Sequence, residues 1–195
     1  MSEIKPNLVL IGGGGHCVSV IDIIENGNEY NILGILELNK TKNNILGYKI
    51  LGDDKLIPKL VNENTYFLIT VGQLKSYSIR KNIAETLIKN NAKLATVISS
   101  LAYVSKHAQI EEGTIIMNHA VVNAKAKIGK NCIINTKSNI EHGVSIGDFC
   151  HISTCAVVNG DCIVGKGSFI GSNATISNNI TIKKNSIINA GNFIK

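Results

Sequence analysis

The chain has 195 residues, of which 44% are hydrophobic and 17% charged, a composition typical of a globular rather than a disordered protein. The formal net charge is +6, but no long block of basic residues occurs and no basic run is interleaved with aromatics, so we expect no nucleic-acid binding. No segment approaches the ~20 apolar residues of a membrane span or resembles a signal peptide, so we expect no membrane insertion. Five cysteines without metal-ligand spacing indicate free thiols in a reducing cytoplasm.

Residues 1–98 alternate strand and helix signals, which favour a small parallel α/β domain of Rossmann-like type. No flexible Gly/Ser linker separates them from residues 99–195, so we expect two closely coupled domains. In chain order, the expected elements are NLVLIGGGGH (7–16, a strand entering a glycine turn), CVSVIDIIENG (17–27, a helix), NILGILE (31–37, a strand), YFLITVG (66–72, a strand) and SIRKNIAETLIKNN (78–91, a helix).

The glycine turn, Gly12 to Gly15, lies between a predicted strand and a predicted helix. Backbone N–H groups and a helix N-terminus can face a phosphate there, which favours a nucleotide or sugar-nucleotide site. A merely structural turn is the alternative. Cys17 occupies the third glycine position of the dinucleotide fingerprint, so an NAD enzyme is not favoured.

From residue 98 to the end, every sixth residue is Ile or Val. A hexapeptide period indicates a parallel β-helix, in which three hexapeptides form one triangular coil. The residue four places after each of these guide residues is small in nearly every repeat, as the corner of a prism requires. The seventeen guide residues are Ile98, Val104, Ile110, Ile116, Val122, Ile128, Ile134, Ile140, Ile146, Ile152, Val158, Val164, Ile170, Ile176, Ile182, Ile188 and Ile194.

Three of the five cysteines, Cys132, Cys150 and Cys162, occupy the small corner position. Their expected role is therefore apolar packing. Cys150 and Cys155 raise the alternative of an acetyl-cysteine intermediate, but no activating pattern accompanies them. We therefore favour direct transfer of any acyl group.

Five histidines are candidates for chemistry. A zinc site needs three converging histidines, and the spacing of the four in the second half of the chain, His107, His119, His142 and His151, does not match such a set, so we expect no metal. For His107 and His119 the expected role is surface or packing. His142 lies two residues after a guide residue, near a coil corner, where a histidine could accept a proton during acyl transfer.

The whole chain resembles a known family. GGGGH (12–16) joined to an uninterrupted hexapeptide prism with NTKSNIEHGVSIGDFCHIS (135–153) resembles the bacterial sialic-acid O-acetyltransferase-like sugar acetyltransferases. Within that family it looks closest to the N-acetyltransferases of nucleotide-linked 4-amino-sugars in bacillosamine and perosamine synthesis. The resemblance implies a left-handed parallel β-helix after the Rossmann-like domain, a homotrimer with active sites at subunit interfaces, and acetyl-CoA as co-substrate.

The resemblance also implies roles for residues of the prism. The histidine matching His142 is the general base, and the one matching His151 lies close to the acetyl-CoA thioester. Backbone around the positions matching Gly160 and Gly171 holds the pantetheine arm. The residue matching Asn135 lies near the base.

In the first domain, the resemblance implies a sugar-nucleotide site. The histidine matching His16 belongs with the glycine loop, and the residue matching Glu37 lies where the nucleoside is recognised. The implied substrate-binding residues are Gly12, Gly14, Gly15, His16 and Glu37 of this domain, together with Asn135 of the prism.

One departure from the family concerns the base. In relatives a carboxylate follows the catalytic histidine and orients its ring, whereas this chain has Gly143 there. Glu141 precedes His142 and is our second catalytic candidate, although neighbouring strand residues point to opposite faces. A backbone carbonyl or a residue of a neighbouring subunit could orient the ring instead.

The expected function is acetyl-CoA-dependent N-acetylation of the 4-amino group of a nucleotide-linked amino-sugar, for bacterial surface glycans or protein glycosylation. O-acetylation of sialic acid or a related sugar is the first alternative. A non-catalytic sugar-nucleotide-binding scaffold and a metalloenzyme are two others.

Overall fold

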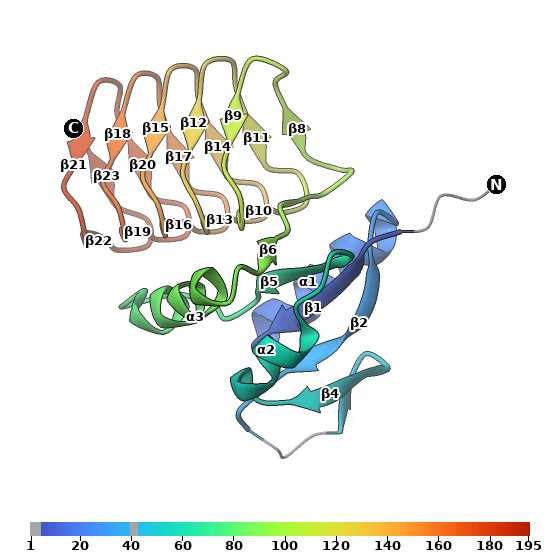
Figure 1. The fold of residues 1–195 in the computed structure, drawn as a ribbon. Coiled ribbons are helices and arrows are strands. Elements are labelled where there is room, and N and C mark those ends of the chain that lie inside the picture. Colours follow the sequence, from blue (N-terminus) through green and yellow to red (C-terminus); the bar gives the residue numbers. More distant parts are fainter. Residues whose placement is uncertain (1–4, 40–42) are drawn as a thin grey trace. The chain divides into compact units, whose positions relative to one another are not determined.

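The computed structural model describes residues 5–39 and 43–195. The chain forms two compact units: Met1–Gly72 with Ser78–Ala95, here the N-terminal unit, and Gln73–Tyr77 with Thr96–Lys195, here the prism unit (Figure 1). The short segment Gln73–Tyr77 thus groups with the second half of the chain, for which the sequence alone gives no signal.

The N-terminal unit contains a six-stranded sheet of order β3-β4-β2-β1-β5-β6, parallel except for the hairpin between β3 and β4. The central strand β1 pairs with β2 and β5 and is almost wholly buried, which explains its unbroken apolar sequence. Its strands are β1 (Asn7–Ile11), β2 (Asn31–Leu36), β3 (Asn44–Ile45), β4 (Tyr48–Gly52), β5 (Thr65–Ile69) and β6 (Lys93–Leu94).

The helices of this unit are α1 (Gly15–Gly27), α2 (Ile57–Leu60) and α3 (Ser78–Lys89), with a 3₁₀ turn at Asp54–Leu56. The three strands and two helices predicted from the sequence are confirmed. Helix α1 ends at Gly27, as the predicted range did, and Asn28 after it adopts the left-handed conformation. It begins at Gly15, two residues before the predicted start. The β3–β4 hairpin, β6 and α2 were not predicted, since these short elements carry too few residues for a periodic pattern.

The prism unit is a left-handed parallel β-helix, as the resemblance implied. Each of its short strands ends at a guide residue. The strands are β7 (Val97–Ile98), β8 (Tyr103–Val104), β9 (Gln109–Ile110), β10 (Ile115–Ile116), β11 (Val121–Val122), β12 (Lys127–Ile128), β13 (Ile133–Ile134), β14 (Asn139–Ile140), β15 (Ser145–Ile146), β16 (His151–Ile152), β17 (Val157–Val158), β18 (Ile163–Val164), β19 (Phe169–Ile170), β20 (Thr175–Ile176), β21 (Thr181–Ile182), β22 (Ile187–Ile188) and β23 (Phe193–Ile194).

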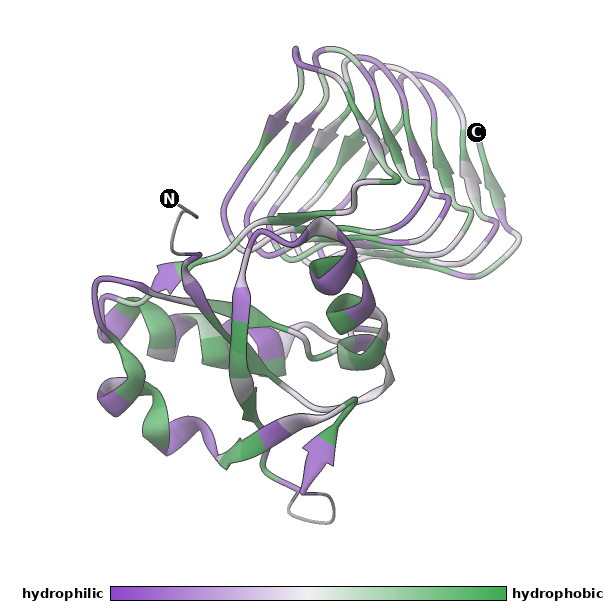
Figure 2. Ribbon diagram, turned by 90° about the vertical axis from the view of Figure 1, so that its right-hand side faces the viewer, coloured by the Kyte–Doolittle hydropathy of each residue, from purple (hydrophilic) through white to green (hydrophobic). Residues whose placement is uncertain are grey.

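Each strand pairs with the strand one coil away, so that Ile116 lies beside Ile134 and Ile134 beside Ile152. The strands thereby form three parallel sheets, and hydrophobic residues recur from coil to coil (Figure 2). The guide residues from Ile116 to Ile182 are buried inside the prism together with the small corner residues, including the three predicted packing cysteines.

The turns of the prism follow a third period-six pattern, which lies in the backbone conformation. The third residue after each guide residue, from Gly113 to Gly191, has a positive φ. Glycine and asparagine occupy many of these positions because they tolerate the left-handed region. Phe149, Cys155 and Asp161 occupy three others, so identity alone does not reveal the pattern.

No helix among the described residues has both the length and the apolar character needed to cross a lipid bilayer.

Candidate functional site

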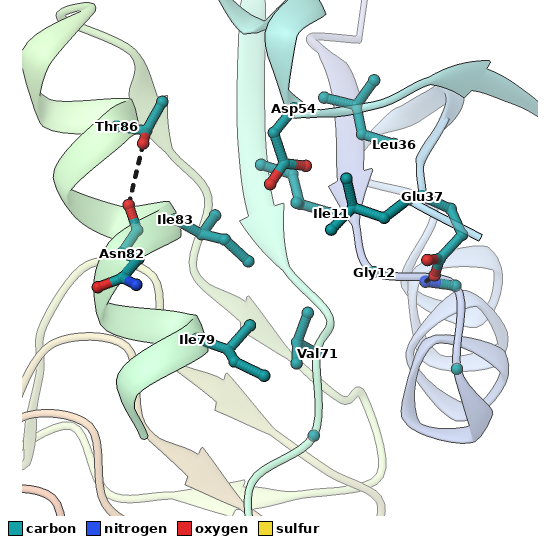
Figure 3. A pocket seen from close by; sticks show the side chains of 14 residues that line it. Ile11, Gly12, Leu36, Glu37, Asp54, Val71, Ile79, Asn82, Ile83 and Thr86 are labelled. Carbon is teal, nitrogen blue, oxygen red and sulfur yellow. Dashed lines mark hydrogen bonds between the residues drawn. The ribbon is translucent and has the colours of Figure 1, made fainter. Parts of the chain in front are cut away.

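The N-terminal unit has a cavity of about 520 Å³ at the carboxyl ends of β1, β2 and β5. Ligands of open parallel sheets bind at this edge. Figure 3 shows Asp54 and Glu37 on one side of the cavity and Asn82 and Thr86 of α3 on the other, with aliphatic side chains between them. The described lining residues include no lysine or arginine.

The carboxylate of Glu37 is hydrogen-bonded to the backbone of the glycine loop. One oxygen of its carboxylate accepts a hydrogen bond from the backbone N–H of Gly13, and the other accepts one from the N–H of Asn39 at 2.9 Å. Nearby, burial first and then the charges of Asp53 and Glu37 raise the pKa of the Asp54 carboxyl. The cavity therefore offers carboxylate acceptors, which suit the N–H donors of a nucleobase better than they suit phosphate.

The glycines of the loop differ in what they require. Gly12 has a φ of +102°, and a Cβ atom on it would lie 2.9 Å from the backbone nitrogen of Val71, so its role is structural. Gly14 and Gly15 have no atom within 4 Å of such a Cβ. Their backbone faces open space at the start of α1, where a ligand can approach. His16 lies in the first turn of α1, close to Gly72.

In the prism unit, His151 is held from both sides of its ring. Its Nδ1 lies 2.6 Å from the carbonyl oxygen of Gln73, and its Nε2 lies 3.0 Å from Nδ2 of Asn135. A carbonyl only accepts, so Nδ1 carries the proton and Nε2 accepts from the Asn135 amide. The orientation of that amide is fixed because its Oδ1 accepts from the N–H of Thr136 at 2.8 Å. His151 is therefore a neutral, buried histidine whose lone pair is engaged.

The segment that supplies this carbonyl is Gln73–Tyr77. Nε2 of Gln73 donates to the carbonyl of Phe149 at 2.8 Å, and the ring of Tyr77 packs on that of Phe149 with centroids 5.5 Å apart. The ring of Phe169 meets His151 edge-on at 5.2 Å. No local pattern marks Gln73, because its partner His151 is 78 residues away.

His142 contrasts with His151. Its side chain is 62% exposed and follows β14 at a corner of the prism. The ring lies over Gly160, one coil further along, where a Cβ atom would come within 2.7 Å of Nε2. Its Nδ1 lies 3.8 Å from Oδ2 of Asp161. An accessible imidazole beside a carboxylate is a combination able to take and release a proton.

Glu141 directs both oxygens of its carboxylate to amides. Nδ2 of Asn123 donates to one at 2.9 Å and Nδ2 of Asn139 donates to the other at 2.9 Å. Gly171 is closely packed: a Cβ atom there would lie 2.5 Å from the backbone nitrogen of Ala190 in the next coil. A packing reason for glycine therefore exists at Gly171 without any ligand.

Within the described residues, no cluster of three or more His, Cys, Asp or Glu side chains is arranged to hold a metal ion. Four of the five cysteines are buried, and Cys155 is half-buried. Sulfur atoms at the prism corners donate to backbone carbonyls of the same corner, such as Cys150 to Gly165 at 3.2 Å. These thiols fill corners, as the repeat pattern predicted.

Comparison with known proteins agrees with this architecture. Residues 7–87 match the PglD N-terminal domain, and residues 125–160 match the bacterial transferase hexapeptide (six repeats). No curated protein sequence matches the chain.

Two solved structures illustrate the likeness. One is a histidine-to-asparagine mutant of perosamine N-acetyltransferase from Caulobacter crescentus in complex with CoA and GDP-perosamine. It is 26% identical with a TM-score of 0.91, over 100% of this chain and 91% of that one. The other is the acetyltransferase domain of PglB from Neisseria gonorrhoeae in complex with acetyl coenzyme A. It is 28% identical with a TM-score of 0.88, over 98% of this chain and 93% of that one.

A hexapeptide β-helix joined to a PglD-type domain defines an enzyme of the acyltransferase class. The resemblance seen in the sequence is confirmed by these matches. Over its whole length the chain is similar to the hexapeptide-repeat sugar acetyltransferases of the bacillosamine and perosamine type.

Proposed function

We propose that this enzyme transfers the acetyl group of acetyl-CoA to the 4-amino group of a nucleotide-linked amino-sugar, with His142 as general base. The observation that carries the proposal is the contrast between two histidines. Nε2 of His151 already accepts a hydrogen bond and the ring is buried, whereas His142 is exposed beside a carboxylate. Only His142 of this pair is free to exchange a proton with a substrate.

The reaction needs no covalent enzyme intermediate. The amine nitrogen attacks the thioester carbonyl carbon while His142 accepts the proton that the nitrogen loses. The tetrahedral intermediate collapses, the carbon–sulfur bond breaks, and the thiolate of CoA leaves and takes up that proton. Alignment of amine and thioester supplies much of the acceleration. The buried cysteines of the prism corners support this direct route.

The cavity of the N-terminal unit suits the nucleoside end of the sugar nucleotide. Asp54 and the acceptors beside Glu37 can receive N–H donors of the base, and the aliphatic lining can cover its faces. The open backbone at Gly14 and Gly15, at the start of α1, suits the diphosphate. We place His16 in the same substrate site.

For the acetyl donor we propose the prism unit. His151 and Asn135, locked to each other, would present a rigid polar surface near the thioester. Backbone around Gly160 and Gly171 would line the path of the pantetheine arm. The solved perosamine N-acetyltransferase holds CoA and the PglB domain holds acetyl-CoA, which supports acetyl-CoA as co-substrate here.

We also propose that the enzyme works in the cytoplasm as a homotrimer with active sites at the subunit interfaces, and that its product enters surface-glycan or protein glycosylation. The domain limits we favour remain residues 1–98 for the sugar nucleotide and 99–195 for acyl transfer. Large side chains on the outside of the prism, such as Ile163 and Phe193, are exposed in the single chain and would suit subunit packing.

The test is release of thiol from acetyl-CoA with a panel of UDP- and GDP-linked 4-amino-sugars, CMP-sialic acid and free sialic acid. We expect turnover with an amino-sugar nucleotide and a loss of roughly 100-fold or more in the His142→Ala variant. Turnover confined to a sialic acid would instead establish the O-acetyltransferase alternative. A folded protein that turns over nothing and binds no CoA would refute both.

A further inference from the structure

The structure assigns to Asp161 the task of positioning His142, a role that rests on the proposed function of His142 as base. Asp161 lies one coil further along the prism, in the turn after β17. Its Oδ2 is 3.8 Å from Nδ1 of His142, and its backbone N–H donates to the carbonyl oxygen of His142 at 3.0 Å. The backbone bond holds the two residues side by side, with the imidazole and the carboxylate at ion-pair distance.

Position 143, directly after His142, is glycine and supplies no carboxylate. A Cβ atom on Gly143 would lie only 2.1 Å from Oδ1 of Asp161. A side chain at 143 and the carboxylate of Asp161 would therefore compete for one space. Glycine at 143 and aspartate at 161 form a matched pair, in which the carboxylate enters the same corner from the next coil.

Glu141 does not fit this role. Both of its oxygens accept hydrogen bonds from amides, those of Asn123 and Asn139, at 2.9 Å each. Turning it toward His142 would leave those two amides without their acceptor. The orienting function for which the sequence offered Glu141, a backbone carbonyl or another subunit thus falls to Asp161.

The chemistry of such a carboxylate is simple. A carboxylate facing Nδ1 favours the tautomer that carries the proton there, which leaves the lone pair of Nε2 for the amine. It also stabilises the imidazolium formed when Nε2 accepts the proton. Nε2 is the nitrogen that lies over Gly160, away from Asp161.

The first test compares kcat and KM of Asp161→Asn, Asp161→Glu and the control Asp148→Asn, which removes another half-exposed carboxylate of the same prism. We expect kcat of Asp161→Asn to fall about 10- to 100-fold, by analogy with the loss when the hydrogen-bond partner of a metal-ligating histidine is removed. KM should change little, and Asp161→Glu should recover part of the loss. Wild-type kcat in Asp161→Asn, with the fold intact, would overturn the assignment.

A second test moves the carboxylate from position 161 to position 143, which faces the same space. Asp161→Ala should lose activity, and adding Gly143→Asp to it should restore part of kcat, because aspartate tolerates the left-handed turn and the vacated corner admits it. Gly143→Asp alone should lower the thermal stability, since two carboxylates then meet in one space. No recovery in a folded double variant would count against the proposal.

A readout without activity separates this proposal from the proposed function. ¹⁵N NMR of the neutral His142 ring should show mainly the Nδ1-protonated tautomer in the wild type and a shift toward the Nε2-protonated form in Asp161→Asn. A tautomer shift in a protein that turns over no substrate would leave Asp161 in place and sink the proposed reaction. Unchanged tautomers together with unchanged kcat would sink the role of Asp161 alone.

Discussion

Gly160 and His142 occupy adjoining space on neighbouring coils. A Cβ atom on Gly160 would lie 2.5 Å from Cε1 and 2.7 Å from Nε2 of the His142 ring, both closer than carbon and nitrogen atoms approach in proteins. Because Gly160 has no side chain, the imidazole ring of His142 can occupy this space. The same ring meets Asp161 through Nδ1, so two successive residues of one turn set the position of the proposed base.

Gly160→Ala should displace the His142 ring without unfolding the prism. The φ of Gly160 is not in the left-handed region, so alanine fits the backbone, and only the ring must move. We expect kcat with the acceptor that the thiol-release panel selects to fall at least tenfold. The control is Gly27→Ala, which adds a methyl group where nothing lies within 4 Å. Wild-type kcat in Gly160→Ala would show that the ring adapts at no cost.

Substitution of Gly12 should lower the stability of the fold, whereas substitution of Gly14 should weaken nucleotide binding. Gly12→Ala places a side chain at positive φ and against the backbone of Val71, so the free energy of unfolding should fall by about 1–3 kcal/mol. Gly14→Ala meets no atom and should unfold at the wild-type temperature. If the loop holds the diphosphate, Gly14→Ala should nonetheless weaken nucleotide binding in calorimetry. Equal unfolding temperatures for the two variants would contradict the structural role of Gly12.

Asn135→Ala should remove a hydrogen bond from Nε2 of buried His151. Loss of the donating amide should lower the free energy of unfolding by about 1–3 kcal/mol. Chemical denaturation measures this loss. In the wild type, ¹⁵N NMR should show His151 protonated at Nδ1, because the Gln73 carbonyl accepts there. A proton on Nε2 would reverse the direction of the hydrogen bond to Asn135.

The thiol of Cys17 should not react with thiol reagents, and its ionisation should lower the free energy of unfolding at alkaline pH. Burial raises the pKa of the Cys17 thiol to about 11, above its ordinary value of 9.0. The unfolded chain loses this proton first, so the free energy of unfolding should decline from about pH 9 to pH 11. Cys17→Ala should flatten that decline. With a thiol reagent at neutral pH, half-buried Cys155 should react before the four buried cysteines, and fast labelling of Cys17 would refute its burial.

The guide residues should carry the stability of the prism. Ile152 is fully buried, so Ile152→Ala should lower the free energy of unfolding by about 2–5 kcal/mol, and Ile152→Val by about 0.5–1.5 kcal/mol. Ile187 is 49% exposed on the outside of β22 and serves as the control. Denaturant unfolding of Ile187→Ala should show a much smaller loss, and equal losses at the two sites would contradict the assignment of interior and exterior.

Much of the fold follows from local pattern. A branched aliphatic residue at every sixth place is enough to specify the β-helix, because one register alone buries all of these residues. The strand of residues 7–11 is likewise marked by its apolar run, and the helix of 78–89 by apolar residues at helical spacing. The β3–β4 hairpin escaped prediction because Leu46 and Gly47, which form its turn, join strands of so few residues.

The residues of the candidate site were only partly predictable from the sequence. The sequence singled out His142, His151 and Asn135 through a resemblance to known enzymes. It could not show that His151 is locked, because its partner Gln73 lies 78 residues away and joins the prism through a short irregular segment. It also left open which group orients His142.

The sequence by itself determined the prism and the glycine loop at the start of α1, and it marked His142 and His151 as candidate site residues. Periodicity and residue type are local properties of the chain. Only the tertiary structure decided which carboxylate faces His142. Asp161 is 19 residues further along, and its position depends on stacking of coils and on a left-handed turn that many residue types occupy. Contacts between coils join residues that no local pattern connects, so these pairings emerge only when the coils are stacked.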